Sequence, residues 1–399
     1  MDWPNYFRFN DWEVKAVIGL GLGFLHHLIE LSLAADIITR LGKHASLDRV
    51  SHASTVSEAI LMKLRVGLVG LGNAWEVRHR PALRALSDRF EVRAVCEPVA
   101  HRAEIAARDF AADAIDGFRV LCQREDIDAV LILSGQWFGA LPILAACEAG
   151  KAVYCASALD FDTEQARLIK QRVEQSGVAF MAEFPRRQAP ATLRLKELIA
   201  TRLGNPRLLF CHQRVPTETT GGQRQMSEAP VSRTHDLVEL VDWCRYVVGG
   251  EPTSVLGLSH STQADPKEVD YEMMSLDFSG PDGPGTKVTA QISSGRYMPA
   301  CWPEAVTYRP PAALQVACEG GIAFIDLPST LVWFDKAGRH MEALDSERPV
   351  GEQMLSQFCR AVTSLVRSTS GLEDAYRAML IVQEAHRSHA EGCRIELGS

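Results

Sequence analysis

The feature that most limits the fold is an alternation of short apolar runs with segments of helical spacing between residues 64 and 182. The apolar runs predict buried strands at residues 64–69, 91–96, 128–133, 152–155 and 178–182. Helices are expected between them, at residues 81–86, 101–110, 141–149 and 163–176. Strands that alternate with helices across short joints form a parallel sheet covered by helices on both faces. This part of the chain is therefore expected to be a doubly wound α/β fold.

The pattern changes after about residue 185, where extended stretches are separated by glycine- and proline-rich turns such as residues 280–285. Strands are expected at residues 207–214, 253–260, 272–278, 287–293, 314–318, 322–327 and 331–334. Helices are expected at residues 191–201, 236–248, 351–368 and 372–389. We therefore expect a C-terminal α+β region with a largely antiparallel, open sheet and helices on one face.

The composition excludes several classes of protein. The 399 residues include 42 Lys and Arg against 50 Asp and Glu, a formal net charge of −8, so no nucleic-acid surface is expected. The ten cysteines are scattered without a CxxC pair, which argues against a zinc ribbon or a thioredoxin-type redox pair. Reduced, buried thiols indicate a reducing compartment, so we expect a cytoplasmic protein, and no spacing predicts a metal site.

A glycine loop follows the first predicted strand and opens the first predicted helix. It reads Gly70-Leu71-Gly72-Asn73-Ala74-Trp75. In the dinucleotide fingerprint GxGxx[G/A], the first glycine permits a tight turn, and the second lets the backbone approach a pyrophosphate at the helix N-terminus. Both glycines are present, but Trp75 takes the third position, where a glycine would let helix and strand approach more closely. We expect pyrophosphate contacts from Gly70, Gly72, Asn73, Ala74 and Trp75; the alternative is a turn that binds no nucleotide.

An acidic residue, Glu97, ends the second predicted strand. A carboxylate in this position accepts hydrogen bonds from the adenosine ribose hydroxyls and repels a 2′-phosphate, which favours NAD over NADP. The alternative is that Glu97 is a solvated loop residue. Strand, glycine loop, helix and acid in this order predict a Rossmann-type, NAD-binding domain.

Further motifs resemble one family. They are residues 126–130 (Asp-Ile-Asp-Ala-Val), residues 146–155 (Ala-Cys-Glu-Ala-Gly-Lys-Ala-Val-Tyr-Cys), His235, the turn at residues 320–322 and the ending at residues 385–392. From about residue 63 to residue 397 the chain is similar to the Gfo/Idh/MocA oxidoreductases, the glucose–fructose oxidoreductase and inositol dehydrogenase-like family. The resemblance implies a Rossmann domain before a substrate domain whose open sheet often packs against another subunit. It also implies hydride transfer between a sugar-like alcohol carbon and the nicotinamide ring.

The chain departs from this family near the expected nicotinamide. The family's Glu-Lys-Pro falls on residues 156–158, so Ser157 replaces a lysine that usually lies beside nicotinamide and substrate. A hydroxyl carries no charge and is a poor acid or base near its ordinary pKa, unlike the lost cation. The family's Thr-Pro-Asn-x-x-His also lacks its histidine here. The resemblance still implies cofactor contacts from Ser134, Gly135, Gln136 and Ser157.

On the substrate side, the family's Asp-x-Gly-x-His-x-x-Asp falls on residues 231–238, where only His235 matches and valine replaces both acids. An imidazole with an ordinary pKa near 6.5 suits proton transfer at neutral pH, so His235 is the candidate catalytic residue. The alternative is a histidine that caps or packs beside the helix starting near Asp236. Arg187 and Arg233 are candidates to hold an anionic substrate or to replace the missing cation, although a structural role is commoner for such arginines.

Residues 1–61 are expected to form a helical N-terminal extension, either an added element or a segment upstream of the enzyme core. The apolar stretch at residues 16–35 is long enough to span a bilayer, but it contains His26, His27 and Glu30. Such groups are costly at mid-membrane, which favours a packed amphipathic helix. No basic region or small-residue cleavage pattern of a secretory signal is found. The expected domains are residues 1–61, residues 62–185 (NAD-binding) and residues 186–399 (substrate binding and oligomerisation).

These observations predict an NAD-dependent oxidoreductase that acts on a sugar, a polyol or a related hydroxylated small molecule. The lost lysine and acids leave two alternatives open: a catalytically degenerate dinucleotide-binding sensor or scaffold subunit, and a redox-neutral enzyme that retains NAD. The expected partners are a small-molecule substrate and further copies of this chain, bound through the C-terminal sheet. No nucleic-acid or membrane partner is expected.

Overall fold

A computed structural model of the chain describes most of the sequence after residue 62. The described residues are 63–135, 137–156, 161, 163–217, 233–261, 269–279, 287–299, 301–302, 304, 308, 310–345, 347–364 and 371–398. They belong to a single compact unit that contains two sheets. The predicted helical extension at residues 1–61 and the predicted turn at residues 280–285 lie outside the described residues.

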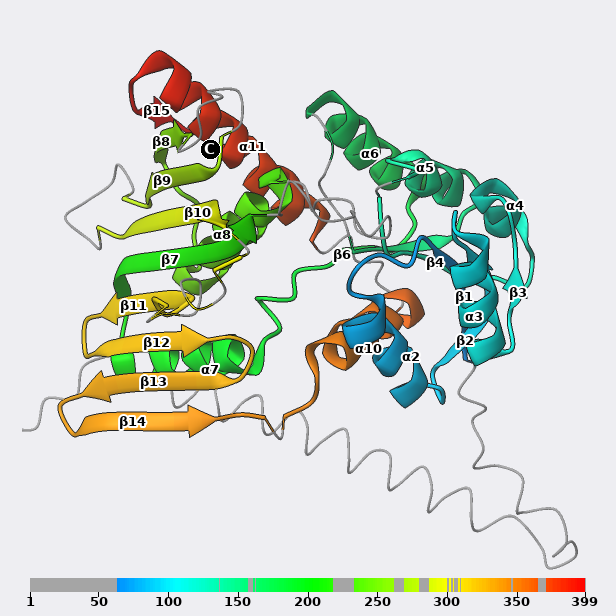
Figure 1. The fold of residues 1–399 in the computed structure, drawn as a ribbon, viewed down its shortest axis with the longest axis horizontal. Coiled ribbons are helices and arrows are strands. Elements are labelled where there is room, and N and C mark those ends of the chain that lie inside the picture. The colour runs from blue at the N-terminus through cyan, green and yellow to red at the C-terminus, as the bar shows by residue number, and fades with distance from the viewer. Residues whose placement is uncertain are drawn as a thin grey trace, which may run out of the picture. The chain divides into compact units, whose positions relative to one another are not determined.

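The first sheet is parallel and has the strand order β3-β2-β1-β4-β5-β6 (Figure 1). Its strands are β1 (Leu64–Val69), β2 (Phe90–Cys96), β3 (Asp113–Ala114), β4 (Ala129–Ile132), β5 (Ala152–Cys155) and β6 (Phe180–Ala182). This order is that of the dinucleotide-binding Rossmann fold, in which the direction of strand addition across the sheet reverses between β1 and β4. The predicted doubly wound α/β fold is confirmed.

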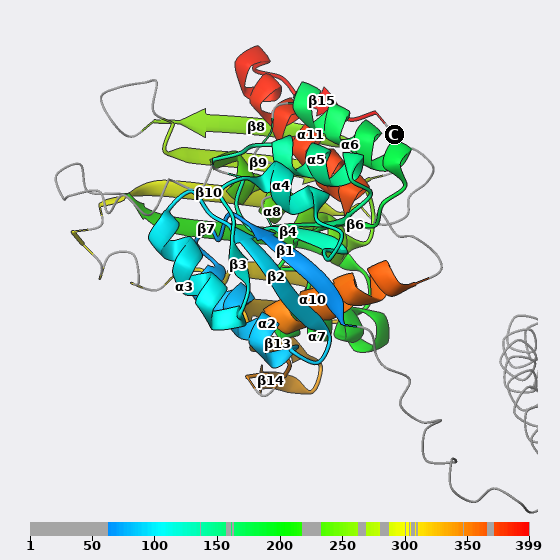
Figure 2. The same ribbon diagram turned by 90° about the vertical axis from the view of Figure 1, so that its right-hand side faces the viewer.

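Helices cover both faces of this sheet because its central strands are apolar on both sides. They are η1 (Trp75–His79), α2 (Arg80–Ala85), α3 (Ala100–Phe110), α4 (Phe118–Gln123), α5 (Leu141–Glu148) and α6 (Thr163–Ser176). Along β1, Val66 and Leu68 join an apolar cluster with α2 and α3, whereas Val69 joins a second cluster with α5 and α6. Figure 2 shows these two layers on opposite sides of the sheet.

The second sheet has nine strands in the order β14-β13-β12-β11-β7-β10-β9-β8-β15. They are β7 (Pro206–Thr217), β8 (Ser254–His260), β9 (Tyr271–Asp277), β10 (Thr289–Pro299), β11 (Leu314–Cys318), β12 (Ile322–Asp326), β13 (Thr330–Asp335), β14 (Gly338–Ala343) and β15 (Ile395–Glu396). Neighbouring strands are antiparallel except β7 and β10, which run parallel. The prediction of a largely antiparallel sheet is therefore confirmed.

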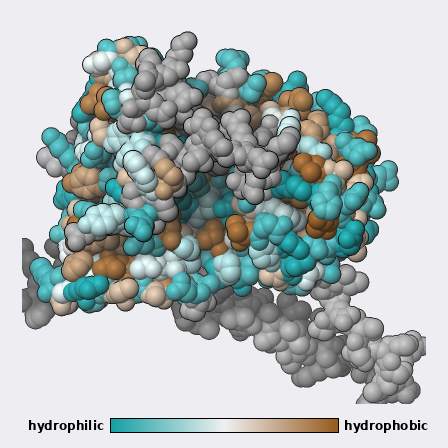
Figure 3. Space-filling model, viewed as in Figure 1, coloured by the Kyte–Doolittle hydropathy of each residue, from teal (hydrophilic) through white to brown (hydrophobic). Residues whose placement is uncertain are grey.

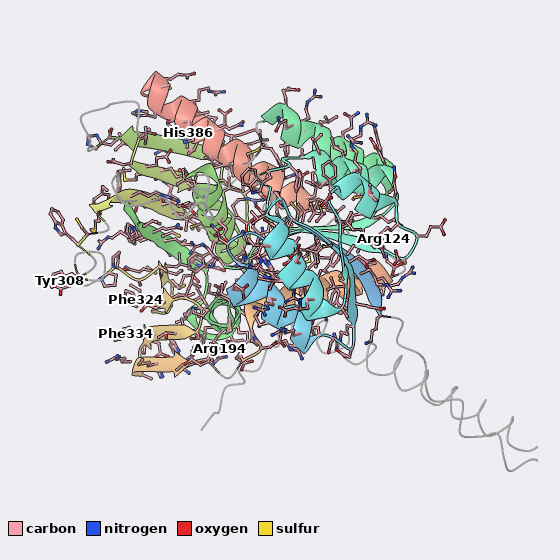
Figure 4. The ribbon with its side chains drawn as sticks, turned by 45° about the vertical axis from the view of Figure 1, so that its right-hand side comes forward. Arg124, Arg194, Tyr308, Phe324, Phe334 and His386 are labelled. Carbon is pink, nitrogen blue, oxygen red and sulfur yellow. The ribbon has the colours of Figure 1, made fainter. Side chains whose placement is uncertain are left out.

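One face of this second sheet packs against helices and the other is open. The covering helices are α7 (Pro190–Leu198) with η2 (Ile199–Leu203), α8 (Arg233–Val248) and α11 (Leu372–Glu391). On the open face, Leu256 and Leu258 of β8 are more than 40% exposed. Phe324 and Phe334 lie side by side there with ring centroids 6.2 Å apart (Figure 4). Apolar and polar residues are interspersed on the side of the molecule seen in Figure 3.

Helix α10 (Val350–Thr363) follows β14 of the second sheet in the chain but packs on the first sheet's helices and apolar cluster. Its residues Met354, Leu355 and Phe358 are fully buried in the cluster that contains Val66 and Leu68. The ring of Phe358 meets that of Tyr154 in β5 edge to face, with centroids 5.4 Å apart. The core of the first sheet is thus completed by a distant part of the chain.

Several short elements were not predicted. Helix α4 and strands β3, β14 and β15 are short or lie at sheet edges, and β14 lacks an apolar alternation because most of its residues are exposed. All ten cysteines are free, and those in the sheets and their covering helices are mostly buried. Within the described part of the chain, none of the helices combines the length and the apolar character needed to cross a bilayer.

The contact between β8 and α11 can be tested at Gly257. A Cβ there would lie 2.0 Å from the Ala385 carbonyl oxygen, and backbone cannot move aside cheaply. We expect Gly257→Ala to lower the free energy of unfolding by about 1–3 kcal/mol, measured by chemical denaturation. Gly250→Ala, where a Cβ would meet open space, is the control and should change stability little. Equal effects of the two substitutions would contradict this packing.

Candidate functional site

The glycine loop joins β1 to η1 at the carboxyl end of the first sheet. Gly70 and Gly72 have backbone φ angles of +62° and +63°, which residues other than glycine rarely adopt. The Gly70 amide donates a hydrogen bond of 2.8 Å to the Cys96 carbonyl oxygen, which fixes the turn to the end of β2. A Cβ at Gly72 would lie 2.5 Å from the Leu133 carbonyl oxygen, so the loop also lies directly against the end of β4.

Trp75 occupies the third position of the fingerprint and changes the helix that follows. The indole is buried in the apolar cluster below the loop and packs on Phe110 of α3, with ring centroids 5.9 Å apart. The first turn after it is a π-turn, in which the Arg80 amide donates to the Trp75 carbonyl oxygen, five residues back. Asn73 at the tip of the loop is exposed.

Glu97 lies at the end of β2 and contacts the backbone of this loop. Its side chain is 2% exposed, and its Oε2 atom accepts a hydrogen bond of 2.8 Å from the Leu71 amide. The guanidinium of Arg102, in the first turn of α3, lies 3.8 Å from Glu97 Oε1 and also donates to the Gly72 carbonyl oxygen at 3.3 Å. Glu97 is one of the predicted cofactor residues, whereas Arg102 was not predicted, because nothing in its spacing along the chain indicates this contact.

The remaining predicted cofactor residues follow β4 and β5. Ser134 contacts the loop, since a Cβ at Gly70 would lie 2.9 Å from the Ser134 carbonyl oxygen. Gly135 accepts a hydrogen bond of 2.8 Å from the Gly139 amide. Gln136 and Ser157 lie outside the described residues, so their contacts stay predictions.

The predicted catalytic histidine lies near the start of α8. This helix begins at Arg233, which places His235 in its first turn, but the side chains of both residues lie outside the described part. The neighbouring Asp236 accepts a hydrogen bond of 2.6 Å from the Arg296 guanidinium of β10. This ion pair fixes the first turn of α8 to the second sheet, whichever role His235 has.

Arg187 has protein partners in a buried ionic network. Its guanidinium forms a bidentate ion pair with Asp242 of α8 and donates to Asp374 of α11 at 2.8 Å. Arg245 also contacts both carboxylates, at 3.5 Å and 3.3 Å. These contacts give Arg187 a structural role in joining α8 to α11, and its contact with a substrate stays a prediction.

A buried polar cluster beneath the glycine-loop helix was not predicted. Glu183, which follows β6, accepts hydrogen bonds on Oε2 from the Tyr154 hydroxyl at 2.8 Å and pairs with His79 Nε2 at 2.9 Å. The Arg78 guanidinium lies 2.5 Å from Glu183 Oε1. Glu183, His79 and Tyr154 are almost fully buried. The cluster therefore links the helix after the glycine loop to the ends of β5 and β6.

The charge on Glu183 depends on these neighbours. Burial by itself raises the pKa of the Glu183 carboxyl, but the nearby His79 and Arg78 and the hydrogen bonds outweigh burial and hold the pKa at about 2. Burial and the adjacent carboxylate raise the pKa of the Tyr154 hydroxyl well above its usual value, so it remains a hydrogen-bond donor. An ionised Glu183 therefore stabilises the fold.

Glu183→Gln tests this cluster. We expect it to lower the free energy of unfolding at pH 7 by about 3 kcal/mol, because it leaves the partly buried Arg78 without its counter-charge and disturbs the buried hydrogen bonds of the cluster. Since the native pKa is depressed, the advantage of the wild type is complete above pH 4.5 and is lost as pH falls toward 2.

Denaturant titrations between pH 7 and pH 3 measure this difference. Glu76→Gln, which removes an exposed ion pair with Arg80, should cost little and is the control. A difference between wild type and Glu183→Gln that stays constant down to pH 3 would contradict the assignment of the charge.

Comparisons with known proteins agree with this geometry. Residues 64–184 match the family model of the Gfo/Idh/MocA oxidoreductases, described as an oxidoreductase family with an NAD-binding Rossmann fold. Inositol 2-dehydrogenase 3 of Saccharopolyspora erythraea is 31% identical over 158 residues, 39% of this chain and 46% of that protein. Inositol 2-dehydrogenase of Cereibacter sphaeroides is 30% identical over 198 residues, 48% of this chain and 56% of that protein.

The chain thus spans about half the length of the curated relatives that it matches. A solved structure covers more of it: aldose-aldose oxidoreductase from Caulobacter crescentus superimposes with a TM-score of 0.70 at 16% identity, over 84% of this chain and all of that one. This likeness shows the shared fold of both sheets. Residues 64–184 of the chain are thus similar to the NAD-binding Rossmann domain of the Gfo/Idh/MocA oxidoreductases, as the sequence motifs indicate.

Proposed function

We propose that this chain is an NAD-dependent oxidoreductase acting on a sugar, a polyol or a related hydroxylated small molecule. The observation that carries the proposal is the glycine loop packed against the end of β4, where the strand order reverses. In such folds a dinucleotide binds outside the carboxyl ends of the strands at this reversal. The inositol 2-dehydrogenases among the relatives support a hydroxylated substrate.

The residues present fit such a coenzyme. The positive φ and the tight approach to Leu133 leave no room for a side chain at Gly72, so the backbone from Gly70 to Trp75 can lie close to a pyrophosphate. Glu97 would face the adenosine ribose, and Ser134, Gly135, Gln136 and Ser157 the nicotinamide half. When bound, the coenzyme would accept a hydride from the alcohol carbon, and the chain's task is to orient both reactants and move the hydroxyl proton.

His235 is the proposed acceptor of that proton. Its position near the start of α8, beside the Asp236–Arg296 pair, gives it a fixed backbone. Arg187 and Arg233 are proposed to orient the substrate, in addition to the ion pairs that Arg187 makes with Asp242 and Asp374.

A second candidate function follows from one specific feature. Residues 156–158 read Ala-Ser-Ala where the family has Glu-Lys-Pro, so the cation beside the nicotinamide is missing. A dinucleotide-binding sensor or scaffold subunit would not need that cation, nor would a redox-neutral enzyme that retains NAD. A panel of polyols, sugars and sugar acids assayed at 340 nm separates these possibilities: turnover with net reduction of NAD supports the oxidoreductase, and isotope exchange alone supports the redox-neutral enzyme.

We also infer a homo-oligomer that forms through the open face of the second sheet. Leu256, Leu258 and Phe334 are large apolar residues exposed on that face, and burying them against another copy would be favourable. The free cysteines favour a reducing compartment, in keeping with a cytoplasmic enzyme.

Coenzyme binding is tested by calorimetry with Gly72→Ala. We expect the wild type to bind NADH and the variant to lose at least about tenfold in affinity, because the new methyl group moves the loop. Gly150→Ala is the control, since Gly150 has a similar φ of +67° but open space around it. Absence of NADH binding by the wild type, or equal binding by both variants, would refute the proposed coenzyme site.

The role of His235 is tested by His235→Asn. We expect kcat on a turned-over substrate to fall about 100- to 10,000-fold, as for loss of a general base, with NADH affinity unchanged. The matched control is His389→Asn on α11, which should retain full activity. Unchanged kcat with lower thermal stability would instead support the capping role.

A further inference from the structure

An acidic and a basic side chain share the end of β2, where the adenosine ribose of the proposed coenzyme would lie. Arg102 Nη1 is 3.8 Å from Glu97 Oε1, and Arg102 Nη2 is 3.3 Å from the Gly72 carbonyl oxygen. The guanidinium therefore bridges the acid and the phosphate-binding loop. The Rossmann rule assigns an acid here to NAD and a nearby arginine to NADP, and this chain has both.

The two side chains differ in exposure and in their other contacts. Glu97 is 2% exposed, and its Oε2 is held by the Leu71 amide at 2.8 Å, so it cannot turn outward without breaking a buried hydrogen bond. The Arg102 side chain is 31% exposed, and both of its contacts are long. The outermost charge at this position is therefore the cation.

We propose that Arg102 binds the ribose 2′-phosphate of NADP(H), so that this site takes NADP(H) as a second coenzyme beside NAD(H). The proposal rests on the proposed function, and it concerns the selectivity of that same site. A lone carboxylate would repel a 2′-phosphate, but ion pairing with Arg102 reduces the repulsion by Glu97. A guanidinium also matches the geometry of a phosphate with two parallel hydrogen bonds.

Arg102 would lose little free energy on exchanging its present partners for a phosphate. A hydrogen bond of 3.3 Å to a carbonyl and an ion pair of 3.8 Å lie at the weak end of their ranges. Arg102 can give up both for a phosphate at the surface, while Glu97 keeps its bond to the Leu71 amide. With NAD(H), Arg102 would move toward solvent, and the ribose hydroxyls would take its place at Oε1 of Glu97.

A purely structural Arg102 would behave differently. If the guanidinium only held the loop through the Gly72 carbonyl, its removal would loosen the pyrophosphate site, which NADH and NADPH share. Both coenzymes would then lose affinity by the same factor. The ratio of the two dissociation constants therefore distinguishes selectivity from loop support.

The experiment is calorimetric titration of the full chain with NADH and with NADPH. For the wild type we expect dissociation constants within about tenfold of each other. Arg102→Ala should weaken NADPH about 10- to 100-fold, the usual worth of a charged hydrogen-bonded pair, and change NADH less than about twofold. Arg108→Ala, an exposed arginine on the same helix, is the matched control and should alter neither.

Glu97→Gln provides the opposite change. Removing the negative charge should tighten NADPH and weaken NADH, because the 2′-phosphate loses a repulsive neighbour and the ribose loses an acceptor. Equal losses for both coenzymes in Arg102→Ala, or a wild type that binds NADH but excludes NADPH by more than about 100-fold, would overturn the proposal while leaving the coenzyme site intact. A wild type that binds neither nucleotide would overturn the proposed function as well.

Discussion

The approach of the Gly72 backbone to the Leu133 carbonyl oxygen is the contact on which the rest of the proposed site depends. It brings the turn after β1 against the end of β4, at the place where the sheet reverses its order. The hydrogen bond from Gly70 to Cys96 holds the same turn to β2. The ends of β1, β2 and β4 therefore fix this short loop. Glu97 and Arg102 are in turn positioned by contacts with its backbone.

Much of the fold could be predicted because its signals are local. Strands β1, β5 and β11 and helix α6 have the predicted bounds, since short apolar runs and helical spacing are visible in a single segment. Strand β14 could not be predicted in the same way. It lies at a sheet edge, and its pairing with β13 depends on neighbours rather than on its own exposed residues.

In the candidate site, too, residues with a local sequence signal could be predicted and residues placed by distant contacts could not. The glycines and Glu97 follow from spacing along the chain, whereas Arg102 and the cluster around Glu183 depend on contacts between distant segments. Trp75 illustrates the limit: its size predicts a wider spacing between helix and strand, but only the structure shows that the helix opens into a π-turn and buries the indole on Phe110. Likewise, Arg187 was predicted beside a substrate, and its bond to Asp242 joins residues that are far apart in the sequence.

The position of α10 has a consequence for how this chain matures on the ribosome. Its Phe358 packs on Tyr154, and its Met354 and Leu355 enter the same apolar layer as Val66 and Leu68. The half of the chain that forms the first sheet therefore emerges during translation with one apolar layer only partly covered, by α2 and α3, until the strands up to β14 and then α10 have been synthesised. Such a nascent intermediate exposes apolar surface that favours aggregation, so we expect chaperones to bind it until α10 has been synthesised.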